Sequence, residues 1–191
     1  MLTASRDRRA VKTREALLRA FFELVVQSSH SYEEICAADI AARAGVARST
    51  LYEHFAGKDA ILAASLARPF GTLADAVRAP DNTPALTAML EHFWGNRALA
   101  RELFAGAMRR HTVAVLVRLV RERLGSERGA RWLVPPPLAA IQIAEALLAP
   151  VTAWLLGARE CSAARLAHAL RQSARALTQT LAGARLSDRR G

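Results

Sequence analysis

The chain has 191 residues, which is enough for one domain of ordinary size or for a small module joined to a larger one. Apolar residues make up 52% of it and aromatic residues only 6%, while 41 positions are alanine, so an all-α protein is expected. The two cysteines, Cys36 and Cys161, match no metal-binding spacing, and a chain of this length needs no disulfide. A disulfide scaffold is therefore excluded, and a reducing cytoplasm is the expected compartment.

The formal net charge of +10 suggests nucleic acid as a partner, but its distribution does not show where that partner would bind. Residues 1–60 contain nine Lys and Arg against eight Asp and Glu, and residues 61–191 contain eighteen against nine. Only the first fourteen residues are locally basic, through Arg6, Arg8, Arg9, Lys12 and Arg14. No apolar run of signal-peptide type follows this basic arm, so secretion is not expected. The arm can be a solvated tail or can reach DNA, and both possibilities stay open.

Three helices are expected in the first part of the chain. Apolar residues recur at three- and four-residue steps from Arg9 to Gln27, as on a helix with one buried face. A shorter helix fits Ala37 to Ala44, and another fits Val46 to Phe55. Gly45 lies between the two short helices and adopts a left-handed conformation without steric cost, so it predicts a sharp turn there.

Longer helices are expected beyond Gly57. Proline, glycine and capping residues divide this part into helices at residues 58–79, 83–94, 96–108, 109–124, 138–158 and 162–182. The prediction is therefore about nine helices in two domains, residues 1–57 and residues 58–191. The segment 137–158 is long enough to cross a membrane, but Gln142, Glu145 and Pro150 interrupt it. It is predicted to be a buried helix of a bundle, with no membrane as partner.

The two short helices and the glycine between them form a helix-turn-helix pattern. Ala41 is small where the helices would cross, and the inward-facing side chains would be Ile40, Val46, Leu51 and Phe55. With these buried, the step of about 100° per residue leaves other side chains on the outer faces of the second helix, namely Arg48, Ser49, Tyr52 and Glu53, with Thr50 on one flank. Such a surface can lie against phosphates and base edges in a major groove, so binding to double-stranded DNA is predicted.

The residues DIAARAGVARSTLYEHFAGKDAIL, at positions 39–62, resemble the DNA-binding domain of the tetracycline-repressor (TetR) family of bacterial transcriptional regulators. The resemblance is carried by Ile40, Ala41, Ala44 to Val46, Thr50, Leu51, Tyr52, His54, Phe55 and Lys58. It covers about residues 10–65, and the remainder resembles the family in architecture alone. The family commonly has hydroxyl residues where Cys36 and Ala47 stand here, and Glu53 adds a negative charge. These departures put at least two hydroxyl contacts to phosphate in doubt.

The resemblance implies a role for each matching polar side chain. Phosphate contacts are expected from Thr50, Tyr52, His54 and Lys58, and base contacts from Arg48 and Ser49. Arg48 is the best candidate for bidentate recognition of guanine, a contact worth about 1 to 3 kcal/mol of discrimination. The alternatives are that Tyr52 packs in the core and that His54 is a structural histidine.

The resemblance also implies a repressor that binds a palindromic operator as a homodimer and is released by a small effector. The dimer is expected to form through the last two helices, with an interface of Leu147, Leu148, Val151, Trp154, Leu155, Leu166, Ala169, Leu170 and Leu177. An apolar or aromatic effector is expected among Phe93, Trp94, Phe104, Met108 and His111. In each set the alternative is that the side chains pack the core of a single chain.

Other classes of function have less support in the sequence. No cofactor or metal is expected, because His92, His111 and Cys161 lack helical ligand spacing. The GKDA segment at 57–60 is not a phosphate loop, because Tyr52 and Asp59 replace its glycine and hydroxyl positions. An all-helical enzyme would need a nucleophile elbow, a zinc motif or a carboxylate pair, and none is evident. The second alternative is a DNA-bound protein of chromosome organisation that has no effector. All of these functions are expected in the cytoplasm, and the DNA-binding ones at the nucleoid.

Overall fold

The computed structural model describes residues 2–27, 32–78, 81–125, 132–157 and 161–183, and the described residues are nearly all helical. The N-terminal helices are α1 (Leu2–Gln27), α2 (Ala37–Ala44) and α3 (Arg48–His54). The following elements are α4 (Lys58–Ala74), the short 3₁₀ turn η1 (Asp75–Val77), α5 (Thr83–Gly95), α6 (Arg97–Phe104), α7 (Arg109–Leu124), α8 (Pro136–Leu156) and α9 (Ala163–Leu181). The predicted all-α fold of about nine helices is confirmed.

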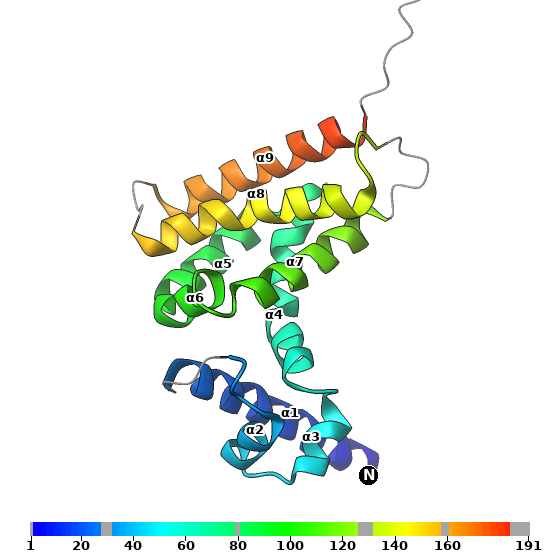
Figure 1. The fold of residues 1–191 in the computed structure, drawn as a ribbon, viewed down its shortest axis with the longest axis vertical. Helices are drawn as coiled ribbons and strands as arrows, with labels where there is room; N and C mark the ends of the chain where they lie inside the picture. Colours follow the sequence, from blue (N-terminus) through cyan, green and yellow to red (C-terminus); the bar gives the residue numbers. More distant parts are fainter. Residues whose placement is uncertain (1, 28–31, 79–80, 126–131, 158–160, 184–191) are drawn as a thin grey trace, which may run out of the picture.

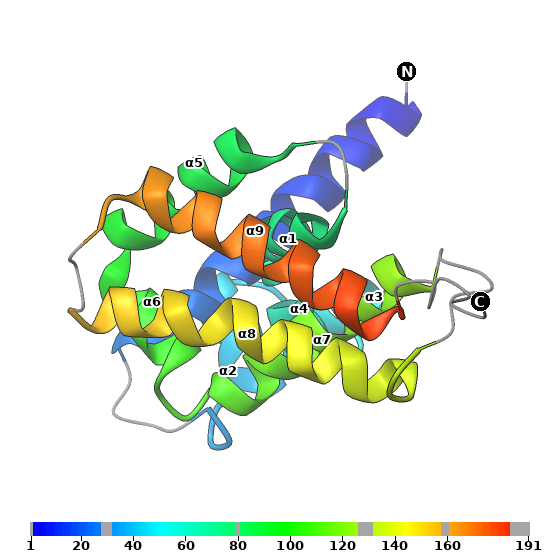
Figure 2. The ribbon, with the colours of Figure 1, turned by 90° about the horizontal axis from the view of Figure 1, so that it is seen from above.

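The helices form a small unit and a larger one (Figure 1). Helices α1 to α3 lie together at one end of the molecule, and α4 leads from them into the group formed by α5 to α9. Seen from above, α8 and α9 run side by side across the far end of this group (Figure 2). Helix α4 starts at Lys58, and the division into domains after residue 57 stays a prediction.

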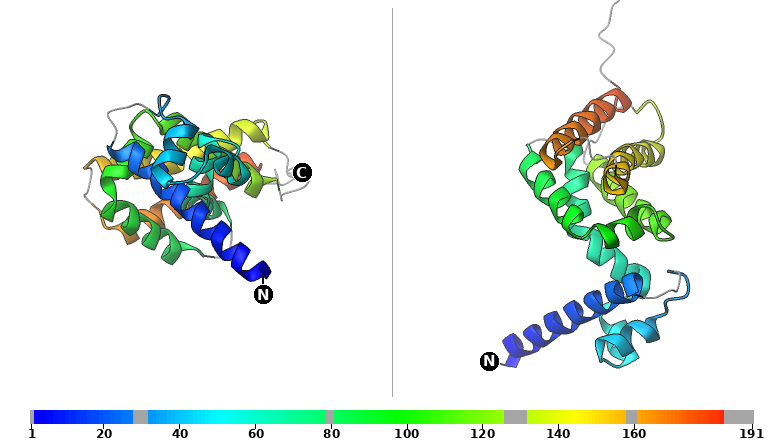
Figure 3. Two further views of the ribbon diagram at one scale, coloured as in Figure 1. Left: turned by 90° about the horizontal axis from the view of Figure 1, so that it is seen from below. Right: turned by 90° about the vertical axis from the view of Figure 1, so that its left-hand side faces the viewer.

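The first helix begins earlier than its apolar pattern predicts. Helix α1 starts at Leu2 rather than near Arg9, so the basic arm is part of a helix and not a solvated tail. Both views in Figure 3 show this amino-terminal part projecting beyond the rest of the small unit. Arg8, Arg9 and Lys12 are exposed on it, whereas the side chain of Arg6 lies outside the described part. The predicted break at 28–31 also lies outside the described residues.

Two predicted helices end earlier in the structure. Helix α4 stops at Ala74 instead of residue 79, and the turn that follows is held by Arg123, whose Nε lies 2.6 Å from Asp75 Oδ1. Helix α6 stops at Phe104 instead of Met108, where the N–H groups of Ala105 and Gly106 both donate to the carbonyl of Arg101. A Cβ at Gly106 would lie 2.9 Å from the Glu102 carbonyl, so only glycine fits this tight turn.

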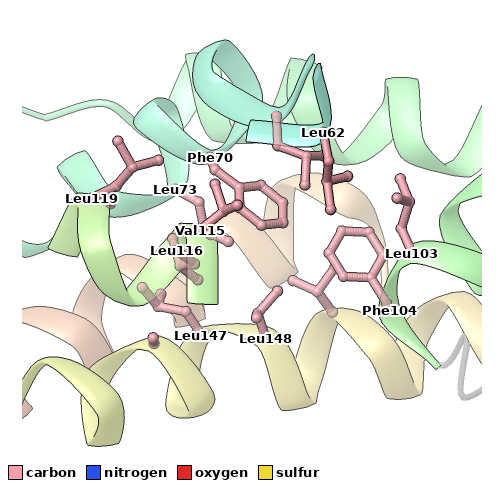
Figure 4. Packing of buried hydrophobic residues seen from close by; sticks show 14 of the residues in the cluster. Leu62, Phe70, Leu73, Leu103, Phe104, Val115, Leu116, Leu119, Leu147 and Leu148 are labelled. Atoms are coloured by element: carbon pink, nitrogen blue, oxygen red, sulfur yellow. The ribbon is translucent and has the colours of Figure 1, made fainter. Parts of the chain in front are cut away.

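The core of the larger unit is packed with apolar side chains from α4 to α9 (Figure 4). Phe70 of α4 stacks on Phe104 of α6 with their ring centroids 5.8 Å apart, and Leu147 and Leu148 of α8 approach the same region. The stretches Lys58–Val77 and Pro136–Leu156 are long and apolar enough to cross a membrane by length and composition, a test that core helices also meet. Since Leu147, Leu148 and their neighbours on α8 are buried in this core, the structure agrees with a bundle helix there.

Candidate nucleic-acid interface

The turn between α2 and α3 has the geometry that Gly45 predicts. Gly45 has a left-handed conformation with φ 68° and ψ 33°, and its N–H donates to the Ala42 carbonyl at 3.1 Å. The next N–H, from Val46, donates to the Ala41 carbonyl at 3.0 Å, which satisfies two carbonyls at the end of α2. Ala41 is 2% exposed, as expected where two helices cross closely. The helix-turn-helix is thus present, with Ile40, Leu51 and Phe55 buried beneath it.

The two positions that lack the usual hydroxyl residues are at the starts of α2 and α3. Cys36 is the N-cap residue of α2, and its N–H donates to the Asp39 carboxylate at 2.8 Å. A carboxylate at this end also interacts favourably with the helix dipole. Ala47 is the N-cap residue of α3 and provides no side-chain cap. Asp39 therefore compensates part of the lost cap at α2, a role that the sequence pattern did not reveal.

The exposed side of α3 presents the polar side chains that the helical pattern placed there. Arg48, Ser49, Tyr52 and Glu53 are exposed, and Tyr52 retains 48% of its accessible surface. Thr50 is half-buried on the flank. Because Tyr52 is so exposed, the alternative that it packs in the core is wrong.

Arg48 and Tyr52 contact each other one turn apart on this face. Arg48 Nη2 donates to Tyr52 Oη at 3.4 Å, and the guanidinium carbon lies 5.6 Å from the centre of the ring. The hydrogen bond to Tyr52 raises the pKa of Arg48, which is therefore charged at any physiological pH. The contact is long for a hydrogen bond and fully exposed, so it can orient the guanidinium and still yield to a guanine edge.

Arg14 of α1 holds the end of α3 in place. Its Nη1 lies 3.5 Å from the carbonyl oxygen of His54, and its guanidinium carbon lies 4.3 Å from the centre of the Phe55 ring. A second contact joins α1 to α2, because Arg43 Nε lies 2.8 Å from Glu23 Oε2. From the sequence, Arg14 was predicted only as a charge of the basic arm. The contact could not be predicted from the sequence, because Arg14 and His54 are 40 positions apart.

Lys58 is positioned differently from the other predicted phosphate contacts. Its ammonium group donates to the carbonyls of Tyr32 at 2.8 Å and Glu33 at 3.0 Å, and it lies 4.6 Å from the centre of the Tyr32 ring. Two of the three protons of the ammonium group are therefore used inside the protein. Lys58 thus ties the loop before α2 to the start of α4, and its contact with a phosphate stays a prediction. His54 is half-buried, with its carbonyl bound by Arg14.

His111 lies at the junction between the small and the large unit. Its Nε2 is 3.1 Å from Glu33 Oε1, its Nδ1 is 3.7 Å from Asp59 Oδ1, and its ring packs on Tyr32 with centroids 4.5 Å apart. The hydrogen bond to His111 lowers the pKa of Glu33, and the charges of Lys58 and Arg110 act in the same direction. Burial raises the pKa of Tyr32, helped by its hydrogen bond to Asp59. We refer to Tyr32, Glu33, Lys58, Asp59, Arg110 and His111 as the junction cluster.

The other residues predicted to bind an effector lie in the packed core. Phe93 and Phe104 are 5% and 1% exposed, and their rings meet edge to face with centroids 5.1 Å apart. Met108 is 2% exposed, and Trp94 packs on Trp154 at 4.8 Å. These side chains are packed against one another, and their contact with an effector stays a prediction. His111 belongs to the junction cluster instead, so the five residues do not surround one cavity.

Most of the residues predicted to form a dimer interface are buried within the single chain. Seven of the nine are at most 8% exposed, namely Leu147, Leu148, Val151, Trp154, Leu155, Leu166 and Leu170. Ala169 is exposed and Leu177 is half-buried. These seven side chains pack against neighbouring helices of the same chain, so a partner chain would have little contact with them. The apolar pattern was sufficient to find buried faces but could not distinguish packing within a chain from packing between chains.

Metal-binding groups do not gather in the described part of the chain, where no three His, Cys, Asp or Glu side chains are placed to hold an ion. Within these residues Cys36 is exposed and Cys161 is half-buried, and both are free thiols. His92 is on α5, His111 on α7 and Cys161 before α9, in separate surroundings.

Comparison with known proteins identifies the small unit. The sequence model described as "Bacterial regulatory proteins, tetR family" matches residues 26–65. The uncharacterized HTH-type transcriptional regulator YxbF of Bacillus subtilis (strain 168) is 35% identical over 69 residues. That match covers 36% of this chain but only 18% of the relative, so it concerns a small part of that protein.

Two solved structures have the same fold over most of the chain. A TetR transcriptional regulator from Streptococcus agalactiae has a TM-score of 0.56 at 22% identity, covering 90% of this chain and 98% of that one. A TetR-family transcriptional regulator from Syntrophomonas wolfei has a TM-score of 0.53 at 17% identity, covering 87% and 94%. The chain thus shares its overall fold with these two proteins. Residues 26–65 therefore match the DNA-binding segment of the TetR family.

Proposed function

We propose that two copies of this chain bind a palindromic operator, each with α3 in the major groove. The observation that carries the proposal is the exposed row of Arg48, Ser49 and Tyr52 on a helix fixed by the Gly45 turn. An α-helix fits the major groove, where each base pair presents a distinct set of donors and acceptors. Two such helices read two half-sites about 34 to 36 Å apart.

The side chains of α3 have different roles in this proposal. Arg48 recognises guanine through its O6 and N7, and Ser49 lies beside it near the base edges. Tyr52 and Thr50 donate hydroxyl hydrogen bonds to phosphates and so fix the position of the helix. His54 supports the end of α3 at the edge of the interface. Arg14 acts through His54 and Phe55 by holding α3 at the correct angle.

The dimer, in this proposal, forms through the exposed faces of α8 and α9. Leu138, Ile141 and Leu156 are 55%, 45% and 53% exposed along α8. Between them α8 exposes small side chains, including Ala149 and Ala153, and α9 likewise exposes Ala169, Ser173 and Ala176. Small residues allow two helices to approach closely, and the large apolar residues gain from being covered. These residues replace the buried set that the sequence predicted.

Regulation requires no chemical reaction in this proposal. The protein acts in the cytoplasm, at the nucleoid, as a repressor that leaves its operator when a small effector binds. The effector needs only to bind more tightly to a form in which the two copies of α3 no longer match the half-sites. Such coupling is typically worth about 1 to 3 kcal/mol.

The proposal is tested by selecting bound fragments from a random duplex library with the purified protein and sequencing them. We expect enrichment of one inverted repeat whose half-sites are spaced by about one helical turn. The complex should contain two chains per duplex. Enrichment of no sequence, or of half-sites without symmetry, would contradict the proposed mode of binding.

A further inference from the structure

A cleft of about 540 Å³ separates α4 from α5 on the larger unit. Its apolar lining includes Pro69 of α4 and Ala85, Ala88 and Met89 of α5. Met89 is 8% exposed and forms part of the floor, while Ala88 is an exposed residue of the wall. A space of this size with a mainly apolar lining is typical of small-molecule sites.

The side chains of Arg68, on α4, and His92, on α5, lie on opposite walls of this cleft. Other arginines of the same unit have carboxylate partners: Arg123 Nε lies 2.6 Å from Asp75 and Arg171 Nε lies 2.8 Å from Asp81. Among the described residues no carboxylate lies within ion-pair distance of the Arg68 guanidinium. The Thr72 hydroxyl donates to the backbone carbonyl of Arg68 at 3.3 Å. The cleft therefore carries a positive charge that the surrounding protein does not compensate.

The α4 wall also offers hydrogen-bond acceptors. Pro69 has no N–H, so the carbonyl of Ser65, four residues earlier, lacks its usual helical donor. The Ser65 hydroxyl donates to the Ile61 carbonyl at 2.8 Å, which leaves its oxygen able to accept. Ser65 and Pro69 both line the cleft. A ligand with a donor group would thus find acceptors beside the positive charge of Arg68.

Two further clefts are less suited to an anion. The groove of about 590 Å³ between α1 and α6 contains Arg19 and Arg97, but Glu23 lies within 4.0 Å of Arg19 and pairs with Arg43. The cleft of about 300 Å³ between α4 and α7 contains Asp59, whose carboxylate accepts from Tyr32. Negative charge in both places opposes an anionic ligand.

We propose that the cleft between α4 and α5 is the effector site and that it binds a small organic carboxylate with an apolar body. Arg68 and His92 hold the carboxylate, and the apolar part lies over Met89 and Ala88. This inference rests on the proposed function, since it assigns the effector and its place. The same helix, α4, also carries Lys58, which is bonded to the loop before the helix-turn-helix. A ligand that alters the packing of α4 against α5 therefore acts on an element that touches the small unit.

The test is calorimetric titration of the full-length protein with three carboxylates, namely benzoate, 2-naphthoate and octanoate. Two matched probes, 2-naphthylmethanol and 2-naphthylmethylamine, have a similar apolar body without the negative charge. We expect 2-naphthoate or another of the carboxylates to bind, and the naphthyl amine to bind at least tenfold more weakly than 2-naphthoate. The variant Arg68→Gln should lose at least tenfold in affinity for the carboxylate. The matched variant Arg118→Gln, an exposed arginine of α7, should bind as the unchanged protein does.

A second variant tests the place of binding independently of charge. Ala88→Trp puts a large side chain into the cleft and should abolish binding of every probe, with the helical circular dichroism unchanged. Equal affinity of the unchanged protein and both cleft variants, or absence of binding by all three carboxylates at about 1 mM, would overturn the inference.

The same preparations are assayed for operator binding, which separates the two proposals. DNA binding that is intact in the absence of carboxylate binding rejects the effector site alone. Failure of the unchanged protein to bind any DNA rejects the proposed function itself.

Discussion

His111 Nε2 at the start of α7 lies 3.1 Å from Glu33 Oε1 in the loop before α2, and its ring packs on Tyr32. One side chain of the larger unit thus touches the segment that leads into the helix-turn-helix. Lys58 and Asp59 at the start of α4 contact the same loop residues. The junction cluster therefore joins the larger unit to the segment before the helix-turn-helix, and changes in it are expected to alter DNA binding without any contact to DNA.

The first prediction concerns the pH dependence of this junction. The pKa of Glu33 is lowered in the folded protein, so its carboxylate stabilises the fold above its unfolded pKa of about 4.3. This contribution is lost as the pH falls through the lower folded value. Thermal unfolding of the protein and of Glu33→Gln should therefore differ at pH 6 and converge in strong acid. The exposed Glu91→Gln variant is the control, and a difference that grows toward low pH would contradict the assignment.

The second prediction concerns the support of α3 by α1. Replacement Arg14→Ala removes the bond to the His54 carbonyl and the contact with the Phe55 ring, together worth about 1 kcal/mol. We expect reduced affinity for operator and random DNA alike, because the orientation of the whole helix is affected. Arg19→Ala, on the same helix with a side chain 75% exposed, should change affinity little. Loss confined to the operator would instead indicate that Arg14 reads bases.

The third prediction concerns the turn at Gly45. A Cβ there would meet no atom within 4 Å, so any cost of Gly45→Ala comes from its left-handed conformation. That conformation costs an alanine about 1 to 2 kcal/mol, measured as the free energy of unfolding in urea. Gly95→Ala is the matched control, since its Cβ also meets no atom within 4 Å and its φ is not positive. Equal effects of the two substitutions would show that the turn is not strained for other residues.

The fourth prediction concerns the dimer face. Ala153→Arg places a long charged side chain on the exposed side of α8, where the two copies are proposed to meet. Sedimentation velocity should show dimers of the unchanged protein and monomers of this variant, with unchanged helix content. Ala67→Arg, on the exposed side of α4, should remain dimeric. A monomeric unchanged protein would contradict the proposal at once.

The sequence predicted the small unit well because its signals are local. Gly45, Ala41 and the spacing of Leu51 and Phe55 lie within a few turns of helix, where periodicity determines which side chains are buried. The early start of α1 was missed because residues 2–8 contain little apolar periodicity, so nothing in the pattern required a helix there.

The larger unit was predicted less well because its contacts join residues far apart in the chain. Leu147 and Leu166 look alike in sequence whether they face a neighbouring helix or another chain. The role of His111 depends on Glu33, 78 positions away. Equally, Lys58 has the position of a phosphate contact in the sequence pattern, but the carbonyls of the loop before α2 bind it.

We propose that α3 reads operator DNA through Arg48. The most direct test of this proposal is fluorescence anisotropy with the selected operator and a random duplex, for the unchanged protein, Arg48→Ala and Arg118→Ala as control. We predict that Arg48→Ala loses about 1 to 3 kcal/mol on the operator and little on random DNA. Binding of the unchanged protein should weaken steeply as salt rises. Equal losses on both duplexes, or no binding to either one at low salt, would contradict the account.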